Sequence, residues 1–361
     1  MTHPIPLARP SLGADEEAAA LRVLRSGRLV QGPEVAAFEE ALSASCGRRW
    51  AVAVSSGTAA LHLSLWALGV GPGQVVRVPA FTFPATANAV RLVGAELQLV
   101  DVNPRTWCMR LPEKLSERER SLTVHQFGFP AKVFPGDISD AACAAGVPQA
   151  MEGACACLSF HPRKVITTGE GGAIVGDDDG LRDTLRALRA HGMTPKKAAA
   201  RFLHLDLTVP GLNYRLSEQA AAIGRVQLAK LSAFLDERRE LVARYRRRLD
   251  GSGLSFQADT PARSWQTFAV VLPDRPAENE SPETGRDHDR ETLRGALADR
   301  GIETQIASYA LHTLTAYRDD PAKFPVADRL HHRALALPLW NGLPPADVDR
   351  VADALLQSLP A

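Results

Sequence analysis

The chain has 361 residues, of which 45% are apolar and 23% charged, a composition typical of a soluble globular protein. Its formal net charge of +1 gives no electrostatic reason to expect nucleic acid or an anionic membrane as a partner. The first residues, MTHPIPLARPSLGADEE, lack the apolar core of a signal peptide, and no apolar run is long enough to span a bilayer.

Five scattered cysteines, an odd number, argue against a disulfide framework and favour a reducing compartment, so we expect a cytoplasmic protein. Cys155 and Cys157 are two residues apart, which places them on one face of a strand. No second Cys/His pair of suitable spacing accompanies them. We interpret them as small core residues and predict no metal site.

The predicted elements alternate between strand and helix along the first part of the chain. Residues 15–27 are predicted to form a helix, with acids in its first turn, Leu21 and Leu24 on one face and Gly27 after its end. Beyond it the strand-like and helical stretches are WAVAV (50–54), SGTAALHLSLWALG (56–69), QVVRVPAFTF (74–83), PATANAVRLVG (84–94), AELQLVDV (95–102) and SLTVHQFG (121–128). This alternation predicts an α/β fold with a mostly parallel sheet and right-handed crossovers.

The pattern changes after a long helical stretch at residues 216–249. It is followed by the strand-like LSFQAD and SWQTFAVVLP, a helix over 290–300, the strand-like GIETQI and a closing helix from about Asp347. We therefore predict two domains. Residues 1–240, with the N-terminal arm, form a large α/β domain, and residues 241–361 form a small α+β domain.

A small-residue turn, SSGTAAL (55–61), lies where a strand-like run gives way to a helix that Gly57, Thr58 and Ala59 open. Small residues let the backbone approach a ligand, and the free N–H groups at a helix start attract anions. The turn is a candidate phosphate cradle, although many α/β turns share this pattern without binding phosphate. It is neither a Walker sequence nor a dinucleotide fingerprint.

Three further residues are candidates for chemistry. Phe83 lies at a strand end and could cover a flat ring, or it could belong to the core. Asp140 follows GDIS and could be a functional carboxylate or a helix cap. Lys164 lies between the strand-like LSF and the glycine-rich TTGEGG, where a lysine is either a solvated loop residue or an amine that forms an imine with an aldehyde.

Pyridoxal phosphate needs all of these features together. Its aldehyde needs a lysine, its phosphate an anion cradle, its ring face a flat apolar cover, and its ring nitrogen a carboxylate that keeps the nitrogen protonated. The chain offers a candidate for each need in the order 57–59, 83, 140 and 164. This combination is far more specific than any of its parts.

The order and wording of the motifs resemble the DegT/DnrJ/EryC1/StrS family of sugar aminotransferases, which have the aspartate-aminotransferase fold (fold type I). The resemblance runs through IPLARPSLGADEE, LVQGPEVAAFE, AVSSGTAALHLSLWALGVGPG, VPAFTFPATANAV, VHQFGFPA, DAACAAG, SFHPRKVITTGEGGAIV, LNYRLSEQAAAIGRVQL and ALALPL. It implies that Lys164 is the Schiff-base lysine and that Asp140 faces the ring nitrogen. Members that act as dehydratases carry histidine in place of this lysine, so Lys164 favours amino transfer.

The resemblance also implies partners and further site residues. Ser159 is expected to bind the cofactor phosphate, and Asn213 to reach the phosphate of the neighbouring subunit in a homodimer with shared sites. Tyr309 and His312 are expected to line the sugar pocket. The implied reaction moves an amino group from L-glutamate to a keto group of a nucleotide-linked sugar. A regulator without turnover, a sugar dehydratase and a keto-cyclitol aminotransferase remain alternatives.

One region departs from the family pattern, because the chain is short between HQFG and the acidic strand, where the family has a helix. Glu152 then competes with Asp140 for the ring nitrogen. Parallel strands need a connection of a dozen or more residues. Asp140 lies 19 positions before Ser159 (159 − 140) and Glu152 only 7 (159 − 152), which favours Asp140. From His125 to Asp140 there are 15 positions, enough for a minimal crossover without a full helix.

Overall fold

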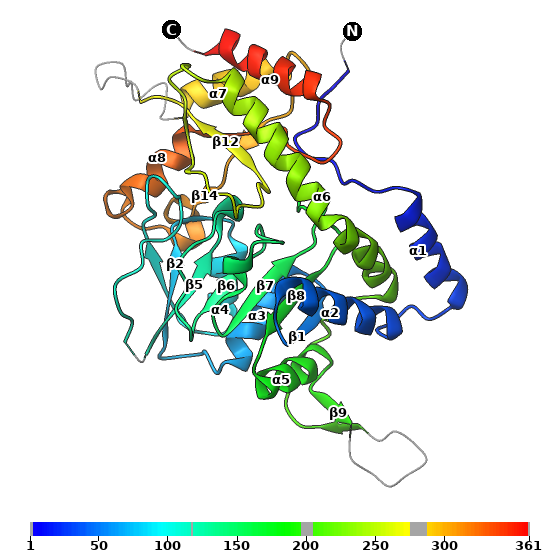
Figure 1. Cartoon of the computed structure of the whole chain (residues 1–361). Helices are drawn as coiled ribbons and strands as arrows, with labels where there is room; N and C mark the ends of the chain where they lie inside the picture. The colour runs from blue at the N-terminus through cyan, green and yellow to red at the C-terminus, as the bar shows by residue number, and fades with distance from the viewer. Residues whose placement is uncertain (1–2, 117, 196–204, 275–286, 360–361) are drawn as a thin grey trace.

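A computed structural model describes residues 3–116, 118–195, 205–274 and 287–359. Its main sheet has seven strands in the order β1-β8-β7-β6-β5-β2-β4 (Figure 1). The neighbours from β4 to β7 are parallel, and β8 is antiparallel to both β7 and β1. The predicted mostly parallel sheet is therefore confirmed. The strands are β1 (Trp50–Val54), β2 (Val75–Pro79), β4 (Glu96–Val100), β5 (Glu119–Val124), β6 (Ile138–Asp140), β7 (Cys155–Ser159) and β8 (Gly172–Gly176).

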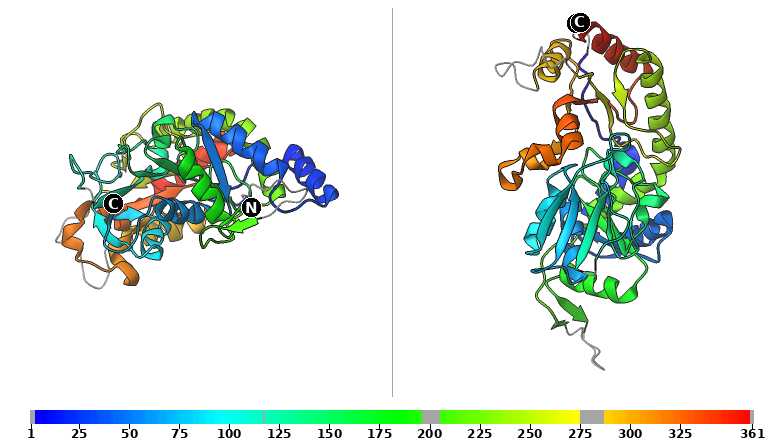
Figure 2. Two further views of the ribbon diagram at one scale, coloured as in Figure 1. Left: turned by 90° about the horizontal axis from the view of Figure 1, so that it is seen from below. Right: turned by 90° about the vertical axis from the view of Figure 1, so that its left-hand side faces the viewer.

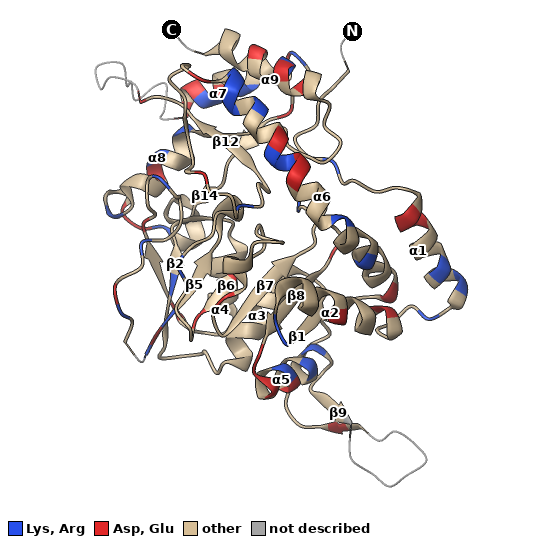
Figure 3. Cartoon of the chain, in the orientation of Figure 1, with Lys and Arg blue, Asp and Glu red and all other residues tan. Residues whose placement is uncertain are grey.

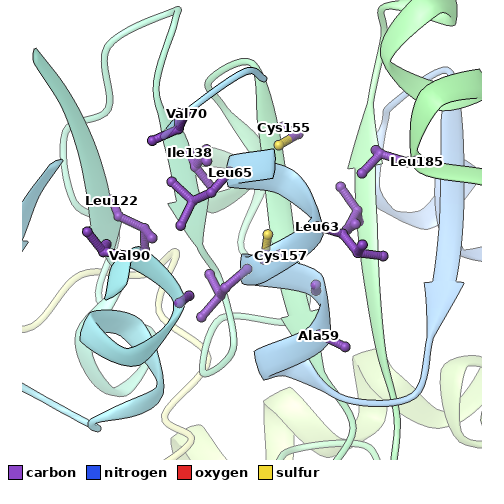
Figure 4. Close-up of a cluster of buried hydrophobic side chains, with 14 of the residues drawn as sticks. Ala59, Leu63, Leu65, Val70, Val90, Leu122, Ile138, Cys155, Cys157 and Leu185 are labelled. Carbon is purple, nitrogen blue, oxygen red and sulfur yellow. The ribbon is translucent and has the colours of Figure 1, made fainter. Parts of the chain in front are cut away.

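One face of this sheet is covered by α3 (Gly57–Ala67), α4 (Ala85–Leu92) and α5 (Asp179–Arg189). Each of the seven strands contributes at least one apolar side chain to the cluster that packs against these helices. Leu63 and Leu65 of α3 lie among side chains that include Cys155 and Cys157 of β7 (Figure 4). Both cysteines are buried and unbridged, so they belong to the core as expected.

The opposite face is covered by α2 (Pro33–Cys46) and α6 (Glu218–Arg248), while α1 (Ala14–Ser26) packs along α6 (Figures 1 and 2). The apolar strand residues of this face lie on β1, β7 and β8. In α1, Ala19 and Val23 face α6, whereas Leu21 and Leu24 are 48% and 52% exposed. The predicted helix is present, and the pair we placed on one face points to solvent.

The shortened crossover between β5 and β6, residues 125–137, is described throughout and holds a single 3₁₀ turn, η1 (Gln126–Gly128). The crossover between β6 and β7 likewise holds η2 (Pro148–Met151). In place of an apolar helix-packing surface, this part of the face presents Ser121, Thr123 and Ser139, which are all buried. The structure confirms a minimal crossover, since β5 and β6 are paired in parallel.

A second sheet of four antiparallel strands lies in the C-terminal part, in the order β11-β12-β15-β13. Its strands are β11 (Ser255–Phe256), β12 (Phe268–Val271), β13 (Gln305–Ile306) and β15 (Ala334–Leu337), with helices α7 (His288–Ala298), α8 (Pro325–Arg333) and α9 (Pro345–Ser358). The remaining elements are β3 (Phe81–Thr82), β14 (Tyr309–Ala310), the pair β9 (Met193–Pro195) and β10 (Leu205–Leu207), and the 3₁₀ turns η4 (Leu311–Thr313), η5 (Thr315–Tyr317) and η6 (Pro321–Lys323).

The predicted domain boundary at residue 240 stays a prediction, because α6 runs through it without a break. Leu241, Val242 and Tyr245 of α6 belong to the C-terminal apolar cluster. Ile5 belongs to the same cluster and pairs with Ile302, although we had assigned the N-terminal arm to the large domain.

Charged residues lie along the helices α1, α5, α6, α7 and α9, whereas β7 and β8 contain none (Figure 3). Within the described residues, no helix combines the length and the apolar character that a membrane crossing requires.

Candidate active site

The candidate residues meet at one edge of the main sheet. Asp140 ends β6, Ser159 ends β7, and Gly57 opens α3 just after β1. Strands β1, β6 and β7 point the same way, since β8 is antiparallel to both β1 and β7. Their carboxyl ends therefore share an edge, which is where open α/β sheets bind ligands.

Lys164 lies in the loop that joins β7 to β8. The loop is fixed at its base by hydrogen bonds from Phe160 N–H to the Gly171 carbonyl at 2.9 Å and from Thr168 N–H to the Phe160 carbonyl at 3.0 Å. The half-buried Lys164 Nζ donates a hydrogen bond to Cys143 Sγ at 3.3 Å. The lysine is thus held toward the end of β6 rather than extended into solvent.

Asp140 is only 5% exposed. Its Oδ2 accepts a hydrogen bond from Thr86 Oγ1 at 2.8 Å, and its Oδ1 accepts one from the Ala142 N–H at 3.1 Å. Burial raises the pKa of Asp140, while these two hydrogen bonds and the positive charge of Lys164 oppose the rise. A buried carboxylate in this setting is well suited to a cationic partner such as a protonated ring nitrogen.

The start of α3 forms a close-fitting backbone cradle. Ser56 caps the helix, and its hydroxyl accepts the Ala59 N–H at 3.0 Å. The N–H groups of Gly57 and Thr58 have no partner within the helix and are the ones free to bind an anion. A Cβ on Gly57 would lie 2.8 Å from Ser159 Cβ, so glycine lets the helix start approach the end of β7.

The phosphate cradle stays a prediction, and the structure changes which N–H groups could serve it. Gly57 and Thr58 present free N–H groups, whereas the N–H of Ala59 is already used by Ser56. Gly172 likewise lets β8 approach the start of α3, because a Cβ at this position would lie 2.4 Å from the Ser56 carbonyl oxygen. Sequence reasoning missed the cap Ser56, although a serine directly before a helix is a known signal.

Phe83 is not part of the core. Its side chain is 64% exposed, and its ring meets that of Tyr309 edge to face with centroids 6.1 Å apart. The two residues are brought together because β14 pairs with β3, with Tyr309 opposite Thr82. Because the ring of Phe83 is exposed beside the half-buried Tyr309, it is free to cover a flat ring.

Three other predicted positions lie elsewhere. His312 is 1% exposed, stacks on Phe324 with ring centroids 4.9 Å apart and has Nε2 3.4 Å from Asp328 Oδ1, so it is packed inside the protein. Asn213 is exposed, and its segment pairs with Ala190. Glu152 is exposed in the crossover after β6, whereas Asp140 is in register on β6 opposite Cys157.

Two contacts of the site were not anticipated from the sequence. Thr86, on α4, holds the carboxylate of Asp140, and Cys143 contacts the amine of Lys164. The only signal was their place inside the stretches PATANAV and DAACAAG. Their contacts depend on the crossovers that bring distant segments together, which a linear pattern does not specify.

The assembled residues fit pyridoxal phosphate. The site combines a primary amine, a buried carboxylate, a helix N-terminus that a glycine opens and an exposed aromatic ring. Lys164 would hold the aldehyde carbon, Asp140 the ring nitrogen, and the start of α3 with Ser159 the phosphate.

The chain as a whole is similar to known aminotransferases. Residues 10–133 and 138–356 match the DegT/DnrJ/EryC1/StrS aminotransferase family. DesV of S. venezuelae, whose structure holds a ketimine intermediate, is 30% identical over 100% of both chains with a TM-score of 0.86. TlmJ, an aminotransferase from Streptoalloteichus hindustanus, is 30% identical over 98% of both chains with a TM-score of 0.85.

A structure of Spr1654 from Streptococcus pneumoniae in its PLP form is 25% identical, covers 99% of this chain and 98% of its own, and has a TM-score of 0.88. A second structure shows the same protein in its PMP form. The family match spans nearly all of the chain, and the fold is that of fold-type-I transaminases. The chain therefore belongs to the DegT/DnrJ/EryC1/StrS aminotransferase family and is a pyridoxal-phosphate-dependent transaminase.

Proposed function

We propose that the enzyme transfers the amino group of L-glutamate to a keto group of a nucleotide-linked sugar. The observation that carries this proposal is the placement of Lys164 beside the end of β6, within 3.3 Å of Cys143 and on the same sheet edge as Asp140. A sugar substrate is supported by the family to which the chain belongs.

When bound, pyridoxal phosphate supplies an electron sink for the charge that develops at the donor's α-carbon. Lys164 Nζ takes the proton from that carbon and, as a positioned general base and acid, returns it to the carbon on the other side of the nitrogen, two bonds away. Asp140 keeps a proton on the ring nitrogen, because an ionised carboxylate favours a neighbouring cation. The N–H groups of Gly57 and Thr58, with the Ser159 hydroxyl, bind the phosphate.

Phe83 and Tyr309 form the open side of the proposed site. The exposed ring of Phe83 can cover one face of a flat group, and the half-buried Tyr309 holds it from the side. A hydroxyl-rich sugar meets both an apolar surface and the phenol group of Tyr309 there. We assign Tyr309 to substrate binding.

We further propose a homodimer in which Asn213 serves the cofactor phosphate of the partner subunit. Asn213 is exposed, so its amide is available to a second chain. The nearby β10 and the residues after it carry apolar side chains that are uncovered, with Leu207 65% and Val209 38% exposed. Apolar groups gathered on one surface suit burial against another copy of the chain.

The lysine assignment is tested by reducing the loaded enzyme with borohydride and mapping the modified peptide. We expect the cofactor adduct on Lys164 and on no other lysine. A purified enzyme should also convert L-glutamate to 2-oxoglutarate when a keto substrate is present. An adduct mapped to another lysine would refute the assignment.

The substrate is tested with a panel of nucleotide-linked keto sugars, free keto sugars and keto cyclitols. We expect turnover with a nucleotide-linked member. A carbocyclic substrate is the second candidate, because the synthase of 3-amino-5-hydroxybenzoic acid is 26% identical over 99% of both chains with a TM-score of 0.85. Turnover of the cyclitols alone would favour that candidate.

Subunit sharing is tested by mixing Lys164→Ala with Asn213→Ala, after each variant has been shown to be nearly inactive. A mixed dimer has one site with both changes and one with neither, so activity should return to a fraction of wild type. Mass spectrometry must show that the subunits exchange. Exchange without returned activity, or an active monomer, contradicts the role of Asn213.

A further inference from the structure

We propose that Cys143 is a positioning residue of the transamination site, whose thiol holds the free amine of Lys164. This inference rests on the proposed role of Lys164. It is carried by the hydrogen bond from Lys164 Nζ to Cys143 Sγ at 3.3 Å. Cys143 follows Asp140 by three residues, so it extends the same strand end toward the lysine.

The contact matters because a lysine side chain is otherwise free to rotate. Lys164 is only half buried, and its four-carbon stem has many accessible rotamers. During each half-reaction the amine is released from the cofactor and must stay near the reacting carbon. A weak, neutral acceptor such as a thiol can orient the amine without fixing a charge on it.

Cys143 is itself held from its backbone. The hydroxyl of Ser264 donates to the Cys143 carbonyl at 2.7 Å, and Ser264 is 1% exposed. Two residues later, the amide of Gln266 donates to the carbonyl of Arg163, the residue that precedes the lysine, at 2.7 Å. One short segment of the C-terminal part of the chain therefore fixes both partners of the Cys143–Lys164 contact.

This segment is anchored independently of the site. Gln257 Nε2 donates to the Gln126 carbonyl at 3.1 Å, and Ala258 N–H donates to the Arg105 carbonyl at 2.7 Å. The guanidinium of Arg263 lies over the ring of Trp265 at 3.6 Å. The backbone of both contact partners is thus held by an anchored segment, which is the condition for a positioning role of the thiol.

The first experiment asks whether Cys143 lies in the cofactor site, with alkylation as its readout. Iodoacetamide is added to the cofactor-free and loaded enzymes, and modified cysteines are mapped by mass spectrometry. Bound cofactor should slow the alkylation of Cys143 at least tenfold. Cys46, the other partly exposed cysteine, lies at the end of α2 and should react equally in both forms. Equal alkylation of Cys143 in the two forms would overturn the proposal.

The second experiment measures how fast the cofactor-free protein binds pyridoxal phosphate on Lys164, by absorbance and borohydride fixation. Cys143→Ala should slow this step about fivefold, which corresponds to the net free energy of one neutral hydrogen bond. Cys143→Ser keeps a hydrogen-bonding atom and should restore most of the rate. Cys46→Ala should leave it unchanged.

If Cys143→Ala binds the cofactor as fast as wild type does, the positioning role is refuted. It is also refuted if Cys143→Ala and Cys143→Ser bind at equal rates, because a packing role alone would not distinguish serine from alanine. An adduct on another lysine would refute the proposed function instead. The two failures are therefore distinguishable.

Discussion

The two faces of the seven-stranded sheet are covered in different ways. On the face that α3, α4 and α5 cover, all seven strands present apolar side chains. On the other face the apolar surface stops at β7, and the neighbouring strands present Ser121, Thr123 and Ser139. Most parallel sheets are apolar on both faces, because helices cover both.

The polar part of the second face matches the short crossovers that lie over it. Ser121 donates to the carboxylate of Asp137, and Ser139 Oγ donates to the carbonyl of Glu152 at 2.8 Å. A loop offers carbonyl and carboxylate groups where a helix would offer apolar side chains, so the strands supply hydroxyl groups. A parallel sheet can therefore lose its crossover helices on one face if its strand sequences change with them.

The largest expected effect is a loss of turnover when Lys164 at the sheet edge is changed, compared with a lysine in the loop over the polar part of the sheet. Lys164→Met should lower turnover by about 10² to 10⁴-fold or more, because the general base is lost. Lys132→Met is the matched control, since Lys132 is exposed in the shortened crossover and lies over the ring of Phe134. Steady-state rates with L-glutamate measure both. A comparable loss in the two variants would contradict a special role for Lys164.

A second pair of changes compares two buried carboxylates at the two ends of β6. Asp140→Asn should lower turnover by about 10² to 10³-fold, as expected when one electrostatic partner of the reacting group is removed. Asp137→Asn, before the strand, should leave turnover near wild type. Glu152→Gln should also have little effect. A larger loss from Glu152→Gln than from Asp140→Asn would reassign the partner of the ring nitrogen.

A third pair compares the two faces at adjacent residues of β5. Leu122→Ala opens a cavity in the helix-covered face and should lower the free energy of unfolding by about 2–5 kcal/mol. Thr123→Val keeps the volume and loses one hydrogen bond, to Ser121 Oγ at 3.1 Å, so it should cost about 1 kcal/mol or less. Urea unfolding monitored by circular dichroism measures both. Equal losses would mean that the polar face is packed as tightly as the apolar one.

The smallest effect concerns the pH dependence of stability. Burial raises the pKa of Asp137 above its ordinary value of 3.8, against the hydrogen bonds from Ser121. The folded state then binds the proton more tightly than the unfolded state does. The contribution of the Asp137 carboxyl group to stability is complete below about pH 3.8 and is lost as pH rises through the raised pKa.

Asp137→Asn should therefore reduce the loss of stability that occurs as pH rises through the raised pKa of Asp137. Melting curves from pH 4 to 8 measure the slope of stability against pH. The cofactor-free Asp140→Asn variant should behave in the same direction, because burial also raises the pKa of Asp140. A slope that is steeper in either variant than in wild type would contradict a raised pKa for that carboxyl group.

The sequence alone determined the fold class and the order of the main elements, and it supplied the candidate residues of the site. The alternation of strand and helix signals, the turn at Gly57 and the lysine before TTGEGG are local patterns, and the structure places them as expected. The count of residues before β7 was enough to favour Asp140 over Glu152, because a parallel crossover has a minimum length. Local chemistry and chain length are written directly into a sequence.

Tertiary structure decided which side chains meet. The resemblance places His312 in the sugar pocket beside Tyr309, yet His312 lies buried in η4 and stacks on Phe324. Thr86 and Cys143 become partners of Asp140 and Lys164 only after the crossovers have brought separate segments to one sheet edge. Contacts between segments depend on the path of the whole chain, so no pattern within a short window could specify them.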